Sequence, residues 1–200
     1  MIPGILLAAG SGTRFGSQKL LALTAGRPVI VRTLENCLFS GLSDIFLILG
    51  HESEKVKAVI GQYFSGEKRV NIVFNPDYQR GIISSFISGL SQLSGRSTGA
   101  MMLLADMPFV RPATIDRLMT SWNGSDILLP EVNGRTTHPR IFPADVFDDF
   151  FRSGQMRTGR EILIRNRARI KTIGFGNDQE FRDIDTVEDL MYPGDKNKEK

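Results

Sequence analysis

Short apolar runs alternate with amphipathic segments along most of the chain. The apolar runs predict five buried strands, over residues 5–9, 44–50, 70–74, 100–105 and 126–130. The second run is continuously apolar from Ile45 to Leu49, which is typical of a parallel strand buried on both faces. Each of the first four runs is followed by a segment with helical spacing of apolar residues, over 28–42, 51–64, 82–93 and 111–122.

This alternation of strands and helices predicts βαβ units, a mainly parallel sheet and an α/β fold. The rhythm changes after residue 130, where we expect a strand at 140–142, helices near 144–151 and 159–166, and a strand at 170–175. The change indicates added antiparallel pieces or a flap that faces the substrate. Because no Ser/Gly-rich linker divides the chain, we expect one domain over 1–192 and a charged, frayed tail over 193–200.

Composition and charge narrow the class of protein. Apolar residues make up 41% of the chain and charged residues 24%, which is ordinary for a soluble globular protein and argues against wholesale disorder. The formal net charge of +3 is too small to indicate a nucleic-acid binder, although it suits small anionic substrates. The single cysteine, Cys37, excludes an intrachain disulfide and a cysteine-cluster zinc site.

The sequence carries no membrane or export signal. The amino terminus lacks a basic region and runs at once into a glycine-rich loop, which favours a core strand over a signal peptide. No run approaches the roughly 20 apolar residues that a membrane-spanning helix requires. We therefore expect a cytoplasmic protein that does not bind membranes.

A glycine-rich loop follows the first strand directly. Gly10, Gly12 and Gly16 let backbone N–H groups approach a phosphate, and Arg14 and Lys19 add positive charge. In an open α/β sheet, ligands bind where the parallel strands end, which is where this loop is expected. An ordinary turn explains the glycines equally well. The loop fits neither the dinucleotide fingerprint nor the P-loop, because Phe15 and Ser17 stand at defining positions.

Asp106 ends the fourth predicted strand and is the strongest candidate for chemistry. A carboxylate at the carboxyl end of a strand can hold Mg²⁺ against substrate phosphates. Pro108 stiffens the turn that follows, because proline cannot extend a ladder of hydrogen bonds. The simpler interpretation is an Asp-x-Pro turn that only ends the strand.

Three further segments have both a structural and a functional interpretation. The stretch from Asn75 to Ser85 predicts a turn and a serine that caps a helix. His138 precedes a proline, where a lone histidine is more often structural than catalytic. Thr186 and Asp189 have the spacing of a helix-capping box.

Taken in order, these segments resemble the motifs of MobA-like nucleotidyltransferases, most closely those of the molybdenum cofactor cytidylyltransferases. The resemblance begins with the loop that opens Leu7-Ala8-Ala9-Gly10. It continues through the Asn-Pro and Ser-Ser segment, Leu-Ala-Asp-x-Pro, His-Pro-x-x-Phe and Asp-Ile-Asp-Thr-x-Glu-Asp-Leu. It covers nearly the whole chain and implies a three-layer, Rossmann-like nucleotidyltransferase fold with a mainly parallel, mixed central sheet.

The resemblance also implies roles for individual residues. The nucleotide would be contacted by Leu7, Ala8, Ala9, Gly10, Ser11, Gly12, Thr13, Arg14, Lys19, Asn75, Gly81, Ser84 and Ser85. Arg14 and Lys19 would stabilise charge during catalysis, and Asp106 would hold Mg²⁺. Asp185 is a second candidate ligand, although capping alone would explain its segment. His138 and Pro139 would lie against the acceptor.

The implied reaction is the transfer of CMP from CTP to the phosphate of a molybdopterin cofactor, with release of pyrophosphate. Ala9 favours CTP, because guanylyl-transferring relatives tend toward glycine there. A transient contact with a molybdoenzyme or its maturation factor would follow. Two departures weaken the assignment of the acceptor: Thr137 replaces a glycine of the family, and residues 154–160 lack an aspartate.

Other functions stay open at this point. One is a MobA-like guanylyltransferase, or a relative that acts on another phosphorylated acceptor such as a sugar phosphate. Another is an NAD(P)-binding oxidoreductase, which needs an acidic residue where the second strand ends; Gly50 and His51 stand there, with Glu52 next. A third is a non-catalytic carrier that hands a cofactor to a partner enzyme.

Overall fold

The structure is a computed structural model that describes residues 1–10, 15, 18–93, 95, 97–152 and 159–191. The strands of its main sheet are β1 (Gly4–Ala8), β4 (Ile45–Leu49), β5 (Val70–Phe74), β6 (Gly99–Leu104), β7 (Ile127–Val132), β8 (Arg135–Thr136), β9 (Arg140–Pro143) and β10 (Ile170–Phe175). The α-helices are α1 (Val29–Leu38), α2 (Ser53–Tyr63), α3 (Ile82–Leu90), α4 (Pro112–Ser121), α5 (Phe147–Arg152) and α6 (Arg160–Arg165). The predicted tail over 193–200 lies outside the described residues.

Within these residues the central sheet has the order β10-β7-β9-β6-β1-β4-β5, with β8 paired to β7. The strands β6, β1, β4 and β5 are parallel neighbours, and β10 is parallel to β7. The strand β9 lies antiparallel between β6 and β7. The expected mainly parallel, mixed sheet is therefore confirmed, and β9 accounts for the change of rhythm after residue 130.

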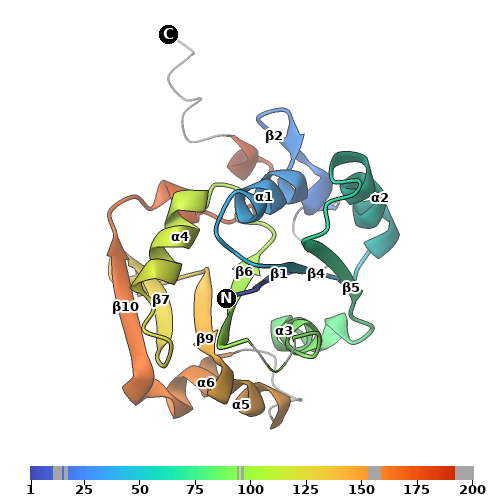
Figure 1. The fold of residues 1–200 in the computed structure, drawn as a ribbon. Coiled ribbons are helices and arrows are strands. Elements are labelled where there is room, and N and C mark those ends of the chain that lie inside the picture. Colours follow the sequence, from blue (N-terminus) through green and yellow to red (C-terminus); the bar gives the residue numbers. More distant parts are fainter. Residues whose placement is uncertain (11–14, 16–17, 94, 96, 153–158, 192–200) are drawn as a thin grey trace.

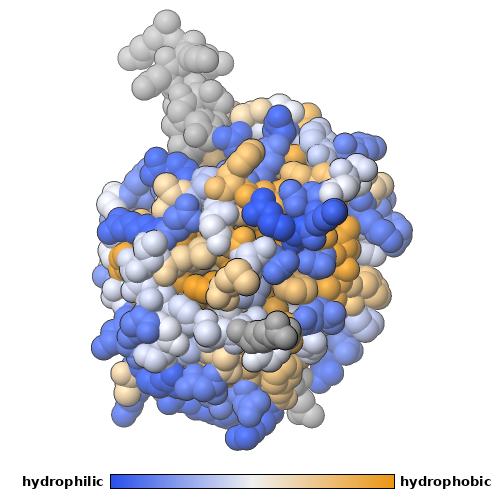
Figure 2. Space-filling view, viewed as in Figure 1, coloured by the Kyte–Doolittle hydropathy of each residue, from blue (hydrophilic) through white to orange (hydrophobic). Residues whose placement is uncertain are grey.

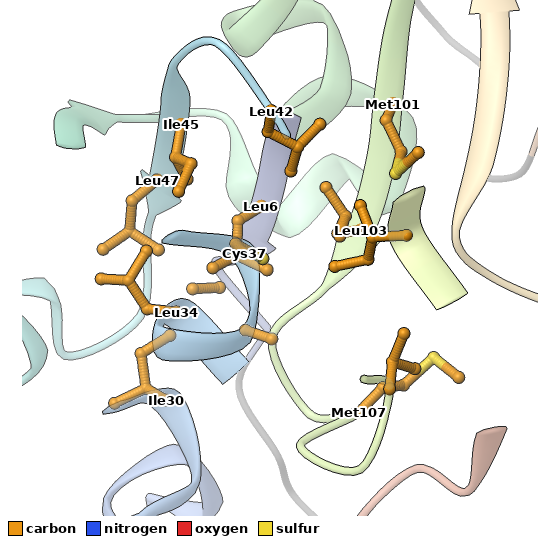
Figure 3. Packing of buried hydrophobic residues seen from close by; sticks show 14 of the residues in the cluster. Leu6, Ile30, Leu34, Cys37, Leu42, Ile45, Leu47, Met101, Leu103 and Met107 are labelled. Atoms are coloured by element: carbon orange, nitrogen blue, oxygen red, sulfur yellow. The ribbon is translucent and has the colours of Figure 1, made fainter. Parts of the chain in front are cut away.

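Helices cover both faces of the sheet, which gives three layers (Figure 1). The helices α1, α2 and α4 lie on one face, and α3, α5 and α6 lie on the other. Two buried clusters fill the spaces between these layers. In the first, Ile30, Leu34 and Cys37 of α1 pack among residues such as Leu6 of β1 and Leu47 of β4 (Figure 3).

Three local details differ from the predicted elements. The segment before α1 forms a small hairpin of β2 (Leu23–Thr24) and β3 (Arg27–Pro28), which was not predicted. Its two-residue turn, Ala25 and Gly26, has φ values of 47° and 77°, as a tight hairpin turn requires. The helix α1 is shorter than expected, and β7 continues past Pro130 because its pairing with β10 extends to Val132.

The surface shown in Figure 2 is mainly hydrophilic at its periphery, with hydrophobic patches toward the centre of the view. In the described part of the chain, every helix is too short or too polar to cross a lipid bilayer.

The packing of α3 against β1 depends on Gly89. A Cβ atom at this position would lie 2.4 Å from Cγ2 of Ile5, whose side chain is fully buried. We expect Gly89→Ala to lower the free energy of unfolding by about 1–3 kcal/mol, because overpacking forces the core to shift. Denaturant unfolding would measure the change.

Gly61 in α2 provides the matched control, because a Cβ atom there would meet nothing within 4 Å. Gly61→Ala should raise the free energy of unfolding by about 0.5–1 kcal/mol, the ordinary gain in an open helix position. Equal effects of the two substitutions would show that α3 does not pack on β1 this closely.

Candidate functional site

A cavity of about 710 Å³ opens where β1 and β6 end. Its lining comes from the ends of these strands, the residues after β4 and β5, and the start of α3. The lining residues are Leu7, Ala8, Ala9, Gly10, Lys19, Leu20, His51, Tyr78, Gln79, Gly81, Ile82, Ser85, Leu104 and Asp106. The cavity therefore lies at the carboxyl edge of the parallel strands, where α/β proteins bind their ligands.

The charged centre of this site joins three segments that are far apart in the sequence. The Lys19 ammonium donates to Oδ2 of Asp106 at 2.6 Å and to Oδ1 of Asp185 at 3.3 Å. Lys19 belongs to a short 3-10 helix, Lys19–Leu21, whose Leu20 is buried in the first core cluster. Three residues singled out from the sequence thus lie in one constellation.

The surroundings of Lys19 keep it charged. Burial lowers the pKa of its ammonium, but the carboxylates of Asp106 and Asp185 more than offset this effect, so the pKa is raised above its ordinary value. The same surroundings disfavour the charged form of a neighbouring carboxyl, that of Asp183. Burial and the nearby negative charges of Asp185 and Asp106 raise the pKa of the Asp183 carboxyl. The site therefore combines one firmly charged cation with an excess of carboxylates.

The segment that carries Asp185 is fixed at both ends and in the middle. On one side, the buried carboxylate of Glu180 accepts hydrogen bonds from the backbone N–H and guanidinium of Arg111, both at 2.9 Å, and from the Thr114 hydroxyl. In the middle, Ile184 N–H donates to the carbonyl of Asp106 at 2.8 Å. Glu180 thereby caps the start of α4 from 69 residues away.

Asp189 fixes the far side of the same segment. One of its carboxylate oxygens accepts hydrogen bonds from the backbone N–H groups of Asp185 and Thr186 and from the Thr186 hydroxyl. Burial acts to raise the pKa of the Asp189 carboxyl. These hydrogen bonds lower it by a larger amount, so the pKa lies below its ordinary value. The predicted capping box thus exists in a modified form: it precedes a 3-10 turn, Glu188–Leu190, and the carboxylate does most of the capping.

Asn75 organises the turn beside the cavity without lining it. Its side-chain amide donates to the hydroxyls of Ser84 and Ser85, both at 3.1 Å, and its Oδ1 accepts from Asp77 N–H at 2.9 Å. Asn75 is buried, and among these residues only Ser85 reaches the cavity wall. The helix α3 starts after Gly81, so the expected serine cap is wrong: Ser84 lies inside the first turn and donates to the carbonyl of Gly81 at 2.8 Å.

The other predicted nucleotide contacts divide into two groups. Six of them line the cavity: Leu7, Ala8, Ala9, Gly10, Gly81 and Ser85. The other four predicted contacts, Ser11, Gly12, Thr13 and Arg14, lie outside the described residues.

Sequence reasoning missed two rings in the cavity wall. The rings of His51 and Tyr78 lie 6.3 Å apart, centroid to centroid, and both residues line the cavity. Gly50 makes room for Tyr78, because a Cβ atom on Gly50 would lie 2.6 Å from Cβ and Cγ of that tyrosine. His51 N–H also donates to the Ala9 carbonyl at 3.3 Å. The glycine at the end of an apolar strand was the available signal for such a close approach.

His138 and Pro139 do not line this cavity. They are joined by a cis peptide bond just before β9. Pro139 lies on the α1 side of the sheet, beside Cys37, Leu103 and Met107. The His138 ring is hydrogen-bonded to the backbone of Met102 in β6.

Asp106 and Asp185 are the candidate ligands for a divalent cation at this site. Asp106 and Asp185 each direct an oxygen at one cation, the Lys19 ammonium. Within the residues that the structure describes, no three His, Cys, Asp or Glu side chains form a complete metal site. Two carboxylates are the usual protein contribution to Mg²⁺ that is shared with substrate phosphates. The residues therefore fit a cation held jointly with a phosphate ligand.

Comparisons with known proteins identify the family and the fold of the chain. A family model described as the MobA-like NTP transferase domain matches residues 4–170. Among solved structures, Rv0371c from Mycobacterium tuberculosis H37Rv has a TM-score of 0.78 at 24% identity and 94% coverage of both chains. A nucleotidyl transferase from Methanothermobacter thermautotroptrophicus has a TM-score of 0.80 at 22% identity, again covering 94% of both chains. These structures establish the fold.

Curated proteins resemble this chain at about the same sequence identity as these structures. The bifunctional protein GlmU of Sorangium cellulosum is 27% identical over 148 residues, which cover 70% of this chain but 31% of GlmU. The chain thus spans about a third of the length of that relative. The nicotine blue oxidoreductase of Paenarthrobacter nicotinovorans is 24% identical over 200 residues, which cover 94% of both chains.

The anchor formed by Glu180 gives a first test of the site. We expect Glu180→Gln to lower the free energy of unfolding by about 1–2 kcal/mol at pH 7, because charge-assisted hydrogen bonds to Arg111 and Thr114 are lost. Burial acts to raise the pKa of Glu180, but its hydrogen bonds lower it below the ordinary value. The stabilisation is therefore present above the ordinary pKa of glutamate and is lost as the pH falls through the lower folded-state pKa.

Denaturant unfolding at several pH values would measure this difference. The exposed Glu54 in α2 offers a control, and Glu54→Gln should change the free energy of unfolding by no more than about 0.5 kcal/mol. A Glu180→Gln variant as stable as the wild type at pH 7 would show that the other contacts alone hold the segment.

Proposed function

The chain belongs to the MobA-like NTP transferase domain family, and from this premise we propose that it transfers a nucleotidyl group from an NTP to an anionic acceptor. One observation carries the proposal: the Lys19 ammonium lies between Asp106 and Asp185 at the wall of the cavity. Gly10 and Lys19 line the same cavity, so the start of the glycine loop and a cation are available to one phosphate chain. We further propose that residues 1–192 act as a single unit.

Charge neutralisation is the main demand of this reaction. An oxygen of the acceptor phosphate attacks the α-phosphorus of the NTP, the bond from that phosphorus to the β-phosphate oxygen breaks, and pyrophosphate leaves. Both reactants are anions, so positive charge must bring them together and stabilise the leaving group. Lys19, and Arg14 in the glycine loop, would supply that charge. The attacking phosphate is already ionised near neutral pH, and the mechanism therefore requires no general base.

Asp106 and Asp185 would hold Mg²⁺, which supplies charge stabilisation to the phosphates when it is bound. The pKa of Lys19, which is raised by these two carboxylates, keeps the ammonium charged at every physiological pH. Lys19 can consequently bind a phosphate oxygen without a change in its own protonation.

We propose CTP as the nucleotide and a molybdopterin-type phosphate as the acceptor. Ala8 and Ala9 border the cavity in the place where the family resemblance favours cytosine. The rings of His51 and Tyr78 offer apolar surface to a base. A GTP-dependent relative, or one that acts on a sugar phosphate, is the alternative within the class. Delivery of the product to a molybdoenzyme or its maturation factor would follow in a cytoplasmic pathway.

An oxidoreductase is the second candidate, because the match to nicotine blue oxidoreductase extends over 94% of both chains. The end of β4 argues against a dinucleotide bound in the usual way. The carboxylate that would bind the ribose belongs to Glu52, which instead forms an ion pair with Lys55 of α2. Glu52 is also absent from the described lining of the cavity. Saturable binding of NADH or NADPH with no binding of CTP would favour this candidate.

Substitution of the central charges tests the transferase mechanism. We expect Lys19→Ala and Asp106→Ala each to lower turnover by about 10²–10³-fold, the usual cost of removing one group that stabilises transition-state charge. Pyrophosphate release with Mg²⁺, CTP and molybdenum-loaded molybdopterin would measure it. Lys55→Ala, which removes an exposed lysine of α2, should keep wild-type turnover. Near-normal turnover in both site variants would refute the mechanism.

Nucleotide preference tests the finer assignment. We expect pyrophosphate release with CTP and little with GTP when both are compared at equal concentration with the same acceptor. Ala9→Gly should reduce this preference, because it alters the backbone that borders the base. Equal release with both nucleotides would contradict the role of Ala9. Nucleotide binding without release would retain the transferase site and redirect the search to other phosphorylated acceptors.

A further inference from the structure

The strand β5 leaves one edge of the central sheet open. It is the last strand in the sheet order, and within the described chain it pairs with β4 alone (Figure 1). The Asn75 N–H donates to a carbonyl of β4 at 2.8 Å, and the Arg69 carbonyl accepts an N–H of β4 at 2.7 Å. Because alternate residues of a strand bond to the same neighbour, Val70, Ile72 and Phe74 direct their N–H and C=O groups away from the sheet.

The open edge lacks the features that usually protect an edge strand. Proteins guard such edges with prolines, bulges or charged side chains. The strand β5 reads Val-Asn-Ile-Val-Phe and contains none of these residue types. Ile72 and Phe74 are 40% and 57% exposed, although Val70, on the same face of the strand, packs against the first core cluster. An apolar edge with outward backbone groups is a template for a further strand.

This edge is complementary to a second copy of itself. Two copies related by a two-fold axis perpendicular to the sheet pair antiparallel, so each residue lies opposite a fixed partner. With the axis beside Ile72, that residue lies opposite its own copy, and Val70 lies opposite Phe74 of the other chain. This register pairs all the outward residues with one another and forms about six backbone hydrogen bonds, two for each pair.

The charges that flank β5 favour the same arrangement. Lys68 precedes the strand, Asp77 follows it, and both are exposed. Antiparallel pairing brings the start of one strand beside the end of the other, so Lys68 of each copy lies near Asp77 of its partner copy. Within one chain, Arg69 pairs with Glu67 at 3.6 Å, and Asp77 pairs with Arg80 at the longer distance of 3.9 Å. Lys68 therefore carries the net charge of its end and meets a carboxylate across the edge.

We propose that the chain forms a two-fold dimer in which the β5 strands of two copies pair and the two central sheets become one continuous sheet. A pair of short strands buries less surface than a standard protein interface, so we expect a dissociation constant in the micromolar range. The turn after β5 carries Tyr78 and Gly81 of the cavity wall, and pairing would therefore also brace that wall. The dimer does not depend on the reaction that the chain catalyses.

Sedimentation velocity of the full chain across the micromolar range tests the association. The wild type should show a reversible equilibrium between monomer and dimer. Ile72→Lys places two like charges opposite each other at the axis and should weaken association by about tenfold or more. Ile164→Lys is the matched control, because Ile164 is 56% exposed but lies in α6, which covers a face of the sheet. The control variant should associate like the wild type.

Cysteine cross-linking tests the register. Opposite residues of a hydrogen-bonded antiparallel pair have Cα atoms about 5.5 Å apart, which a disulfide can bridge. Under oxidation by copper–phenanthroline, Ile72→Cys should cross-link to its own copy. Val70→Cys should cross-link to Phe74→Cys but not to its own copy, which would lie about 14 Å away. The native Cys37 is buried and stays out of this reaction.

The other outcomes each overturn part of the proposal. A monomer at every concentration refutes the dimer and leaves the edge to a strand of another protein. Equal association of the wild type and Ile72→Lys places the interface elsewhere than β5. Cross-linking of Val70→Cys to its own copy as readily as Ile72→Cys refutes the register. If Ile72→Lys fails to fold, which circular dichroism would show, the cross-links decide between these outcomes.

Discussion

The ion pairs of Lys19 are the interaction around which the site is built. Asp106, Asp183 and Asp185 gather at one edge of the sheet, and their mutual repulsion is strong near a protein surface, where the effective dielectric is well below that of water. Lys19 offsets part of this repulsion. Burial lowers the pKa of Lys19, but the two carboxylates raise it by more, and the charge of Lys19 in turn opposes the rise in the pKa of Asp183 that burial and the neighbouring carboxylates cause. The ends of β1 and β6 and the final segment of the described chain must all be in place for this balance to exist.

The fold secures that balance mainly through backbone and buried contacts. Parallel strands bring the segments after β1 and β6 to one edge, since the two strands are direct neighbours. The third segment has no strand of its own and depends on side chains. Glu180 attaches it to α4, Ile184 attaches it to the carbonyl of Asp106, and the Thr24 hydroxyl binds the Leu190 carbonyl at 2.7 Å. The hairpin before α1 thus helps to hold this third segment.

The periodicity of apolar residues predicted the fold well, because strands buried on both faces leave a clear signal. The charged residues Lys19, Asp106 and Asp185, which the structure brings together, were also singled out from the sequence, since each lies in a motif that resembles the family's. The wall formed by His51 and Tyr78 was not, because their proximity depends on Gly50 and on the neighbouring strand. The place of His138 and Pro139 outside the cavity lining likewise depends on the path of the chain before β9, which no local pattern reveals.

A bound phosphate ligand would explain why this site holds more carboxylates than cations. Without a ligand, Lys19 is shared by Asp106 and Asp185. Under the proposed function, a triphosphate would compete for the same ammonium, and each contact that Lys19 makes to phosphate would free carboxylate oxygens for a divalent cation. Nucleotide and cation binding would then reinforce each other, because each supplies the charge that the other requires. A site with fewer carboxylates would hold Lys19 as well but would lack this coupling.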